Sequence, residues 1–398
     1  AHAERIGHHW NLYDKALFQT EVRTLQWDEQ ALLWTSTTNW GDKFRSRFVV
    51  PAAGPLHRPK LPGTKGIEKF KRHSFHSSRW DYNYTGGDNF GILHKLSDKR
   101  VGIIGTGATA IQIVPHLGEW AEDLYVFQRT PSSVDVRGNR PTDPDFSNSL
   151  RPGWQKERMD NCNTIVSGRI DILHKLLART KKPGKDKAVD PEKAAADGQK
   201  ADFKKMEQIR ARCNEVVNGP KTADALKPWY NQLCERPCLH DGYLQTFNRP
   251  SVHLVDTDGK GIEEITENGV IASGKPIELD VLVFATGFEL ATSWSHRTNI
   301  EITGRGGEKI SKHWADGTRT LHSWTTRSFP NCFFIQVFQA VSAPNFLHIT
   351  GEQARHIAYV ISECRKRGVK AVEPTVEAEN WWVDTILEKA KLRAEFLA

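Results

Sequence analysis

Sulfur-containing residues are scarce in this sequence, which has only 2 methionines and 6 cysteines in 398 residues. The cysteines form no CxxC pair. Cys234 and Cys238 lie close to His240, but their spacing matches no standard zinc pattern and a fourth ligand is not evident. The sequence therefore predicts no metal site. It favours free thiols in a reducing compartment, and so a cytoplasmic protein.

Long apolar runs are missing as well. No segment approaches 18 uninterrupted apolar residues, so the sequence predicts no transmembrane helix. The first residues, AHAERIGHH, have neither the apolar core nor the cleavage pattern of a signal peptide. We expect the chain to begin inside a longer protein. The hydrophobic fraction of 38% and the charged fraction of 26% are typical of globular proteins, and the length predicts two or three domains.

The charge is moderately basic, with 55 Lys and Arg against 48 Asp and Glu and a net charge of +7. This excess permits an anionic partner, either a nucleic acid or a phosphorylated cofactor. Much of it lies in residues 181–205, where basic residues are mixed with acidic ones and lack interleaved aromatics. We therefore expect a solvated surface there and no nucleic-acid binding.

The order of elements indicates an α/β protein. Three short segments (21–27, 33–38 and 43–50) predict an antiparallel meander, and the Pro-rich segment 51–62 follows it. The sequence KRVGIIGTGATAIQIVPHL, from residue 99, predicts a buried strand, a glycine turn and a helix to about residue 116. LYVFQ (124–128) predicts the next strand. Later elements are a polar helical insertion at 143–231, strands at 252–255, 270–272 and 279–284, and helices at 352–367 and 377–397.

The glycine turn carries the first functional motif. Gly105-Thr106-Gly107-Ala108-Thr109-Ala110 fits GxGxxG/A directly after a buried strand. The first glycine permits a tight turn, the second lets a pyrophosphate approach the backbone, and the third small residue lets the helix pack closely. The N–H groups at the helix N-terminus then bind the anion. The cofactor-binding residues predicted here are Gly105, Thr106, Gly107, Ala108, Thr109 and Gln112.

The end of the next strand indicates which dinucleotide binds. An NAD site places Asp or Glu about 20 residues after the glycine turn, where it binds the ribose 2′-hydroxyl. This chain has Arg129, followed by Thr130, 22 residues after Gly107. A guanidinium matches the charge and geometry of a 2′-phosphate, so the sequence favours NADP.

A further segment, FKRHSFHSSRWD at residues 70–81, resembles the FxxxxxHxxxWD fingerprint of the Baeyer–Villiger monooxygenases, within the class B flavin-containing monooxygenases. Three further motifs are similar to those of the same family, and the similarity covers nearly the whole chain. The fingerprint residues are Phe70, His76, Trp80 and Asp81. The other motifs are VFQRTP at 126–131, FNRPSVHLVD at 247–256 and ATGF at 285–288, whose Ala285, Thr286 and Gly287 join the predicted cofactor-binding residues.

The resemblance implies an enzyme with two cofactors, FAD and NADPH. NADPH reduces the flavin, O2 reacts with it, and one oxygen atom is inserted next to the carbonyl of a small hydrophobic ketone to give an ester or lactone. The protein must then stabilise negative charge on oxygen with a fixed cation. The family places an arginine for this task shortly before the FNR motif, which here is Arg236. His76 and Trp80 are expected between the domains, where they couple nicotinamide binding to closure.

The resemblance also predicts the domain organisation. We expect two Rossmann-like domains: an incomplete FAD domain at 1–95 and 276–398, and an NADP domain at 96–275 that carries the helical insertion. The family begins with a further GxGxxG-bearing unit for FAD and continues past the last helix, so we expect a chain truncated at both ends that binds FAD poorly. The oligomeric state stays open.

The chain departs from the family pattern at three further places. Arg72 replaces a glycine of the fingerprint. Glu235 replaces a lysine just before Arg236 and is expected to weaken NADPH binding by repulsion. Residues 335–338 (IQVF) lack the glycine that lets the backbone approach the flavin.

Two alternatives remain open at this point. One is a related flavin monooxygenase that oxidises nitrogen or sulfur, which would not require Arg236. The other is an inactive NADP-binding fragment, suggested by Glu235 and by the missing FAD motif.

Overall fold

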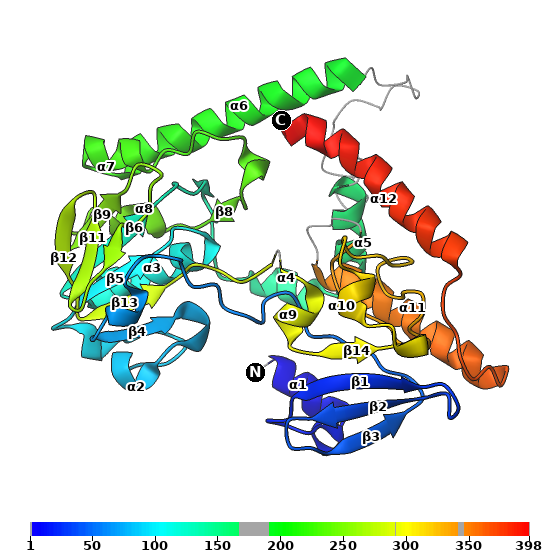
Figure 1. Ribbon diagram of the computed structural model, residues 1–398. Helices are drawn as coiled ribbons and strands as arrows, with labels where there is room; N and C mark the ends of the chain where they lie inside the picture. The colour runs from blue at the N-terminus through cyan, green and yellow to red at the C-terminus, as the bar shows by residue number, and fades with distance from the viewer. Residues whose placement is uncertain (1, 167–190, 291, 341–345, 398) are drawn as a thin grey trace.

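The computed structural model describes residues 2–166, 191–290, 292–340 and 346–397. These residues form two lobes that stand side by side (Figure 1). One lobe is built on a five-stranded parallel sheet and the other on a four-stranded sheet with two long helices. The predicted α/β fold is confirmed. Residues 167–190 of the predicted helical insertion lie outside the described residues.

The parallel sheet has the strand order β4-β13-β5-β6-β9. Its central strands are continuous apolar runs, such as VLVF in β13, because both faces of the sheet are covered. The strands are β4 (His73–His76), β13 (Val281–Phe284), β5 (Arg100–Ile104), β6 (Asp123–Gln128) and β9 (Val252–Asp256). The predicted strands at 101–104, 124–128, 252–255 and 279–284 are thereby confirmed.

The two faces of this sheet have separate apolar cores. Helix α3 (Ala108–Trp120) covers one face, where Val281 and Val283 pack with Ile111 and Leu117. The intervening residues Leu282 and Phe284 point to the other face and pack with a small antiparallel sheet. That sheet consists of β10 (Glu264–Ile265), β11 (Gly269–Ala272) and β12 (Lys275–Glu278).

Strands β4 and β13 extend the sheet beyond the βαβ unit. Val281 of β13 lies opposite His73 of β4 on one side and Val101 of β5 on the other, all in parallel. The sheet therefore includes strands from both sides of the segment 96–275. The division at 95/96 and 275/276 stays a prediction, and strand pairing argues for adding β4 and β13 to the lobe of the parallel sheet.

The second lobe begins with the predicted antiparallel meander. Strands β1 (Val22–Asp28), β2 (Leu33–Thr38) and β3 (Lys43–Ser46) pair in sequence, and β14 (Glu301–Thr303) adds to β1 in parallel. Fully buried Trp34 and Phe334 lie in the core beneath this sheet. The three meander strands are confirmed, although β3 ends four residues before the predicted position.

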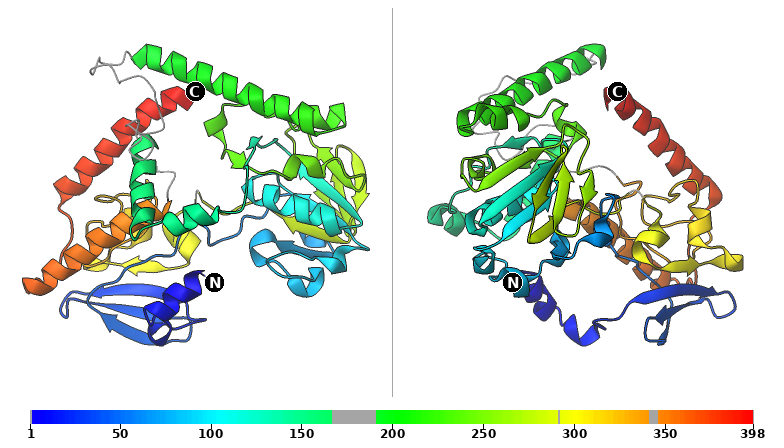
Figure 2. Two further views of the ribbon diagram at one scale, coloured as in Figure 1. Left: turned by 180° about the vertical axis from the view of Figure 1, so that it is seen from behind. Right: turned by 60° about the vertical axis from the view of Figure 1, so that its left-hand side comes forward.

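Helices complete both lobes. The described part of the insertion includes α4 (Pro144–Ser149), α5 (Trp154–Val166) and α6 (Pro191–Val216). Helix α6 runs along the lobe of the parallel sheet and projects beyond it toward the C-terminal end of α12 (Figure 2). Helix α11 (Phe346–Lys366) begins six residues before the predicted start and is followed by Gly368 at φ +66°, a left-handed C′ glycine as predicted. Helix α12 is Val376–Leu397. The shorter helices are α1 (His2–His9), α2 (Tyr82–Thr85), α7 (Pro220–Ala225), α8 (Tyr243–Thr246), α9 (Trp294–Thr298) and α10 (Ile310–His313).

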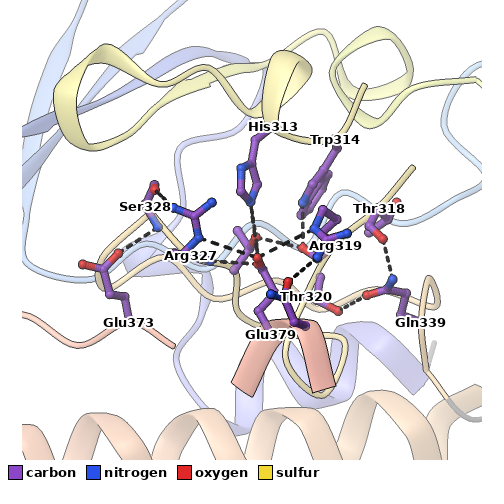
Figure 3. A network of polar contacts seen from close by, with 12 residues as sticks. His313, Trp314, Thr318, Arg319, Thr320, Arg327, Ser328, Gln339, Glu373 and Glu379 are labelled. Atoms are coloured by element: carbon purple, nitrogen blue, oxygen red, sulfur yellow. Dashed lines mark hydrogen bonds and ion pairs between the residues drawn. The ribbon is translucent and has the colours of Figure 1, made fainter. Parts of the chain in front are cut away.

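Helix α12 is fixed to its lobe by a buried carboxylate. Glu379, 1% exposed, accepts hydrogen bonds from the Thr326 hydroxyl at 2.7 Å and from the Arg327 backbone N–H at 3.0 Å (Figure 3). Just before the helix, Glu373 accepts from the Ser328 N–H at 2.8 Å and pairs with Arg305 at 2.6 Å. Two acidic side chains therefore hold the start of α12 against the loop at 326–328.

Two connections that join the lobes pair with each other. One leaves the meander through the Pro-rich segment, and the other follows β13. Lys60 N–H donates to Gly287 O at 2.9 Å, and Glu289 N–H donates to Arg58 O at 3.0 Å, around an antiparallel bridge between Pro59 and Phe288. The lobes are thus joined by a short two-stranded ribbon. None of the described helices is long and apolar enough to cross a membrane.

Candidate cofactor and catalytic site

In the turn between β5 and α3, the backbone of Gly105 lies close to the backbone of Ala285, as the glycine motif predicts. Gly105 adopts φ +110°, and a Cβ at this position would lie 2.6 Å from the backbone oxygen of Ala285. Its N–H donates to Phe127 O at 3.2 Å. Glycine is therefore required here by both the left-handed conformation and the lack of space.

The N-terminus of α3 is open. Gly107 is the N-cap and provides no side-chain hydrogen bond, and nothing lies within 4 Å of the place where its Cβ would be. The first intrahelical bond runs from Ile111 N–H to Gly107 O, so the preceding N–H groups of the first turn remain available. An uncapped N-terminus with free space in front of it suits an anion.

Hydrogen bonds attach this turn to the end of β6. The Thr106 hydroxyl donates to Thr130 O at 2.7 Å, and the Ser132 hydroxyl donates to Thr106 O at 2.6 Å. Thr106 and Thr130 are therefore positioning residues for the turn. Ser132 was not among the predicted residues, because a serine in a loop gives no sequence signal of its own.

Arg129 directly follows β6, and its side chain is exposed. Because β5 and β6 are parallel and Ile104 lies opposite Phe127, Arg129 leaves the sheet at the same edge as the glycine turn. Within the part of the chain that the structure describes, its guanidinium makes no hydrogen bond or ion pair. Gln112, on α3, turns back to donate to Ala108 O at 2.9 Å.

The turn after β13 adjoins the same edge. Ala285 N–H donates to Ile104 O at 2.9 Å, which continues the sheet by one residue. Thr286 donates its hydroxyl to Lys60 O, and Gly287, at φ +78°, accepts from Lys60 N–H. The predicted residues Ala285, Thr286 and Gly287 thus lie between the glycine turn and the ribbon that joins the lobes.

His76 of the fingerprint contacts this ribbon. Its Nδ1 accepts from the Ser78 N–H at 3.2 Å, so Nε2 carries the proton and donates to Gly287 O at 3.0 Å. Burial lowers the pKa of His76, the bond to Gly287 opposes this effect, and nearby Arg79 adds to it. His76 is therefore held as a neutral donor against the inter-lobe connection.

The remaining fingerprint residues make structural contacts, and the coupling role expected of Trp80 stays a prediction. Trp80 Nε1 donates to the Thr85 hydroxyl at 3.0 Å. Asp81 caps α2 by accepting from the Tyr84 N–H at 3.2 Å and contacts His73 at 3.1 Å. Phe70 packs with the core between the parallel sheet and β10–β12. These contacts fix the segment that carries His76.

Arg236 lies on the loop between a short 3-10 helix (Gln232–Cys234) and β8 (Cys238–Leu239). Strand β8 pairs with β7 (Val134–Asp135), which follows the end of β6. The side chain of Arg236 is exposed and makes no hydrogen bond or ion pair with the described residues. The structure therefore brings the Arg236 loop to the segment that follows Arg129, and leaves both cations unpaired.

Tyr230 fixes the segment that precedes Arg236. Its hydroxyl donates to Pro131 O at 3.0 Å and accepts from the Ser133 N–H at 2.9 Å. Burial raises the pKa of Tyr230 to about 12, so the phenol stays neutral and keeps both bonds. Tyr230 was missed in the sequence, since only the fold places it beside the loop after β6.

Comparisons with known proteins identify the family of this chain. The Baeyer–Villiger monooxygenase ATR8 of Stachybotrys chlorohalonatus is 51% identical over 404 residues, covering 99% of this chain and 65% of the relative. Pentalenolactone D synthase of Streptomyces arenae is 49% identical over 409 residues, 100% of this chain and 69% of the relative. A Baeyer–Villiger monooxygenase of Streptomyces coelicolor is 44% identical, covering 100% of this chain and 68% of the relative. The chain belongs to the Baeyer–Villiger monooxygenases.

Solved structures of this family agree with the assignment. The polycyclic ketone monooxygenase of Thermothelomyces thermophila superimposes with a TM-score of 0.86 at 38% identity, covering 96% of this chain and 66% of that one. The open form of cyclohexanone monooxygenase gives a TM-score of 0.79 at 29% identity, covering 98% of this chain and 76% of that one. No protein-family profile matches the chain. The chain spans 65–70% of the length of the monooxygenase ATR8 and of the pentalenolactone D synthases of two Streptomyces species.

Proposed function

We propose that this chain functions as a FAD- and NADPH-dependent Baeyer–Villiger monooxygenase, which inserts one oxygen atom of O2 next to a ketone carbonyl to give an ester or lactone. Family membership supports the reaction class. The observation that carries the proposal is the placement of Arg129 and Arg236 on adjoining segments at one edge of the parallel sheet, where neither pairs with a described residue. One cation suits the 2′-phosphate of NADPH, and the other suits negative charge that develops during oxygen transfer.

The residues present fit NADPH. The open first turn of α3 would receive the pyrophosphate, and Arg129 would receive the 2′-phosphate. Thr106 and Ser132 would hold the glycine turn in place through their bonds to the β6 loop. When bound, the nicotinamide supplies a hydride to the flavin. Glu235, exposed beside Arg236, remains a predicted source of repulsion.

The proposed role of Arg236 follows from its permanent charge. A guanidinium cannot be deprotonated within a protein, so it presents a constant positive charge to an anionic oxygen. Arg236 is exposed on a loop and forms no ion pair with a carboxylate of the described residues, which leaves its charge free for a substrate or cofactor. In a closed, water-free site, such a charge is worth more than in solvent.

We further propose a hydrophobic cyclic ketone as the substrate, with O2 as co-substrate. The related proteins support this class, since one solved relative is a polycyclic ketone monooxygenase and another is a cyclohexanone monooxygenase. A solved relative named OTEMO is in complex with FAD and NADP, with a TM-score of 0.81 at 28% identity, which supports the same cofactor pair here. A reducing cytoplasm stays our expectation for a chain whose six cysteines are free thiols.

The test combines cofactor binding with product analysis. The 398-residue chain is mixed with FAD, and the bound flavin is quantified from its visible spectrum. NADPH, a fused-ring ketone and ¹⁸O2 are then added, and NADPH oxidation and labelled ester are measured together. The flavin-bound fraction of the wild-type protein should incorporate one ¹⁸O atom per ester. Arg236→Ala should keep NADPH oxidation and lose most ester formation, whereas Arg236→Lys should lose less.

A matched control is Arg140→Ala, which removes an exposed arginine from the same lobe. It should leave the ester yield unchanged. Equal ester yields in wild-type protein and Arg236→Ala would refute the role of Arg236. Oxidation of an amine or sulfide without ester formation would favour the nitrogen- or sulfur-oxidising alternative. A colourless protein that binds NADPH would favour the NADP-binding fragment.

A further inference from the structure

The segment that follows α7 runs past the end of β6. The Gln128 side chain donates from Nε2 to Ala225 O at 2.7 Å, and the Tyr230 hydroxyl donates to Pro131 O at 3.0 Å. Along the chain these two bonds lie on either side of Arg129, which directly follows β6. The segment after α7 is therefore held beside the loop that carries this exposed arginine.

One residue of this segment is both large and exposed. Trp229 directly precedes Tyr230, whose bond to Pro131 fixes the backbone at this place, and Trp229 itself is 74% exposed. A single exposed aromatic residue is common on protein surfaces and needs no explanation by itself. Trp229 differs from such a residue in what lies against its ring.

The ring of Trp229 rests on a buried cation. The guanidinium carbon of Arg210, on α6, lies 4.5 Å from the ring centre, and Arg210 is only 9% exposed. Arg210 is itself fixed, because it donates to Pro228 O at 2.9 Å and to Glu207 Oε1 at 2.7 Å. One face of the indole is therefore held by a fixed guanidinium, which is attracted to the ring, while much of the remaining ring surface is open to solvent.

An aromatic ring that is fixed on one side and open on the other suits stacking on a planar group. Nucleic-acid bases stack on aromatic side chains in this way, and every base has a suitable face. A ring that is held in place before the ligand arrives loses little rotational freedom on binding. The neighbouring Arg129 indicates which planar group binds, because a 2′-phosphate is attached to the ribose that carries adenine.

We propose that Trp229 stacks on the adenine of the dinucleotide whose 2′-phosphate binds Arg129. This inference rests on the proposed function, which assigns the site to NADPH, and it names a residue that determines how tightly the adenosine half is bound. Adenine is common to NADP⁺ and NAD⁺. Trp229 therefore contributes to the affinity for both, whereas Arg129 distinguishes between them.

The test measures Kd by isothermal titration calorimetry for NADP⁺, NAD⁺ and adenosine 2′,5′-bisphosphate, which carries the adenine and the 2′-phosphate but no nicotinamide. Trp229→Ala should raise all three Kd values by the same factor, about 5- to 100-fold, because each ligand loses the same stacking contact. Trp229→Phe keeps an aromatic ring and should raise them less. The control is Trp40→Ala, which removes a tryptophan that is 69% exposed in the other lobe and should change none of them.

Kd values for Trp229→Ala that equal those of wild-type protein would overturn the proposal. A loss confined to NADP⁺ and NAD⁺, with the bisphosphate unaffected, would place Trp229 at the nicotinamide half and would also overturn it. Binding of the bisphosphate needs neither flavin nor ketone, so its dependence on Trp229 would support the proposal even if the chain forms no ester and the proposed function fails. Wild-type protein that binds none of the three ligands would overturn this proposal together with the proposed NADPH site.

Discussion

Glu379, near the start of α12, lies 3.6 Å from His313 at the end of α10, measured from Oε1 to Nε2, and the two side chains are only 2% and 7% exposed. Arg319 and Arg327 lie 4.0 Å from the other carboxylate oxygen. One buried carboxylate therefore collects three basic residues from a segment of 15 residues, 313–327, and attaches α12 to it.

Replacement of this carboxylate should weaken the fold in a pH-dependent way. Burial alone would raise the pKa of Glu379, but the contact with His313 and the hydrogen bonds from Thr326 and the Arg327 backbone outweigh it and bring the pKa to about 2. Because the folded pKa is below the unfolded value, this stabilisation is present above about pH 4.5 and is lost as the pH falls toward 2. Glu379→Gln should lower the free energy of unfolding by about 1–3 kcal/mol at pH 7.

Urea unfolding at pH 7 and pH 3 measures this effect, with Glu388→Gln as the exposed control from the same helix. The difference between wild-type protein and Glu379→Gln should shrink at pH 3, while Glu388→Gln should change little at either pH. A Glu379→Gln protein as stable as wild type at pH 7 would show that the network contributes nothing to docking of α12.

Arg129 should determine the preference for a phosphorylated dinucleotide. Arg129→Ala should raise the Kd for NADP⁺ by about 10- to 100-fold and leave the Kd for NAD⁺ nearly unchanged, because only NADP⁺ carries the 2′-phosphate. Isothermal titration calorimetry with both nucleotides measures the two constants. The exposed Arg140→Ala variant controls for the lost charge. Equal weakening of both nucleotides would indicate a general effect of charge or folding.

Ser328 should be improved by glycine. It adopts φ +69°, while its N–H is used by Glu373 and its carbonyl oxygen by the N–H of Arg305. The left-handed region costs a non-glycine residue about 1–2 kcal/mol, and the greater freedom of unfolded glycine offsets about half of that gain. Ser328→Gly should therefore raise the free energy of unfolding by about 0.5–1 kcal/mol.

Thermal and urea unfolding of Ser328→Gly test this expectation. The matched control is Ser97→Gly, at an exposed serine with φ −64°, where the same substitution should destabilise the protein. Destabilisation by Ser328→Gly as well would show that the serine hydroxyl matters more at this turn than the backbone conformation.

His76 should stabilise the inter-lobe connection only as a neutral ring. Because burial lowers its pKa, the unfolded chain binds more protons than the folded one below about pH 6.5, and the contribution of His76 decreases as the pH falls. His76→Leu should lower the free energy of unfolding by about 1–3 kcal/mol at pH 7.5 and by less at pH 5.5. Urea unfolding at both pH values measures this decrease, with exposed His57→Leu as the control. A decrease in the free energy of unfolding that is the same at both pH values would contradict the neutral-donor role.

The sequence predicts the helices and strands correctly where their hydrophobic pattern is local and long enough. The run from Lys99 to His116 alternates a buried strand, a glycine turn and an apolar helix, and the structure has these elements within a few residues. Strand β4 was not predicted, because HSFH is short, mostly polar and paired with residues more than 200 positions away. Strand β14, with three residues, was missed for the same reason.

The site residues also fall into two groups, those that a sequence motif defines and those that only the fold brings together. Gly105, Gly107 and Arg129 occupy positions that a motif and its spacing define, so the sequence could indicate them. Trp229 belongs to none of these motifs, and it lies beside the loop after β6 only because Gln128 and Tyr230 form their hydrogen bonds in the folded chain. No spacing rule detects an exposed ring that rests on a buried guanidinium, since this is a property of its surroundings.

The ribbon between the lobes limits how they can move. A single flexible tether would allow one lobe to spin about the connection as well as to tilt. Here the segments at 58–60 and 287–289 run antiparallel and are joined by backbone hydrogen bonds, so spinning would have to break these bonds whereas tilting would not. The ribbon should therefore resist rotation of one lobe about the connection more than it resists tilting of one lobe toward the other.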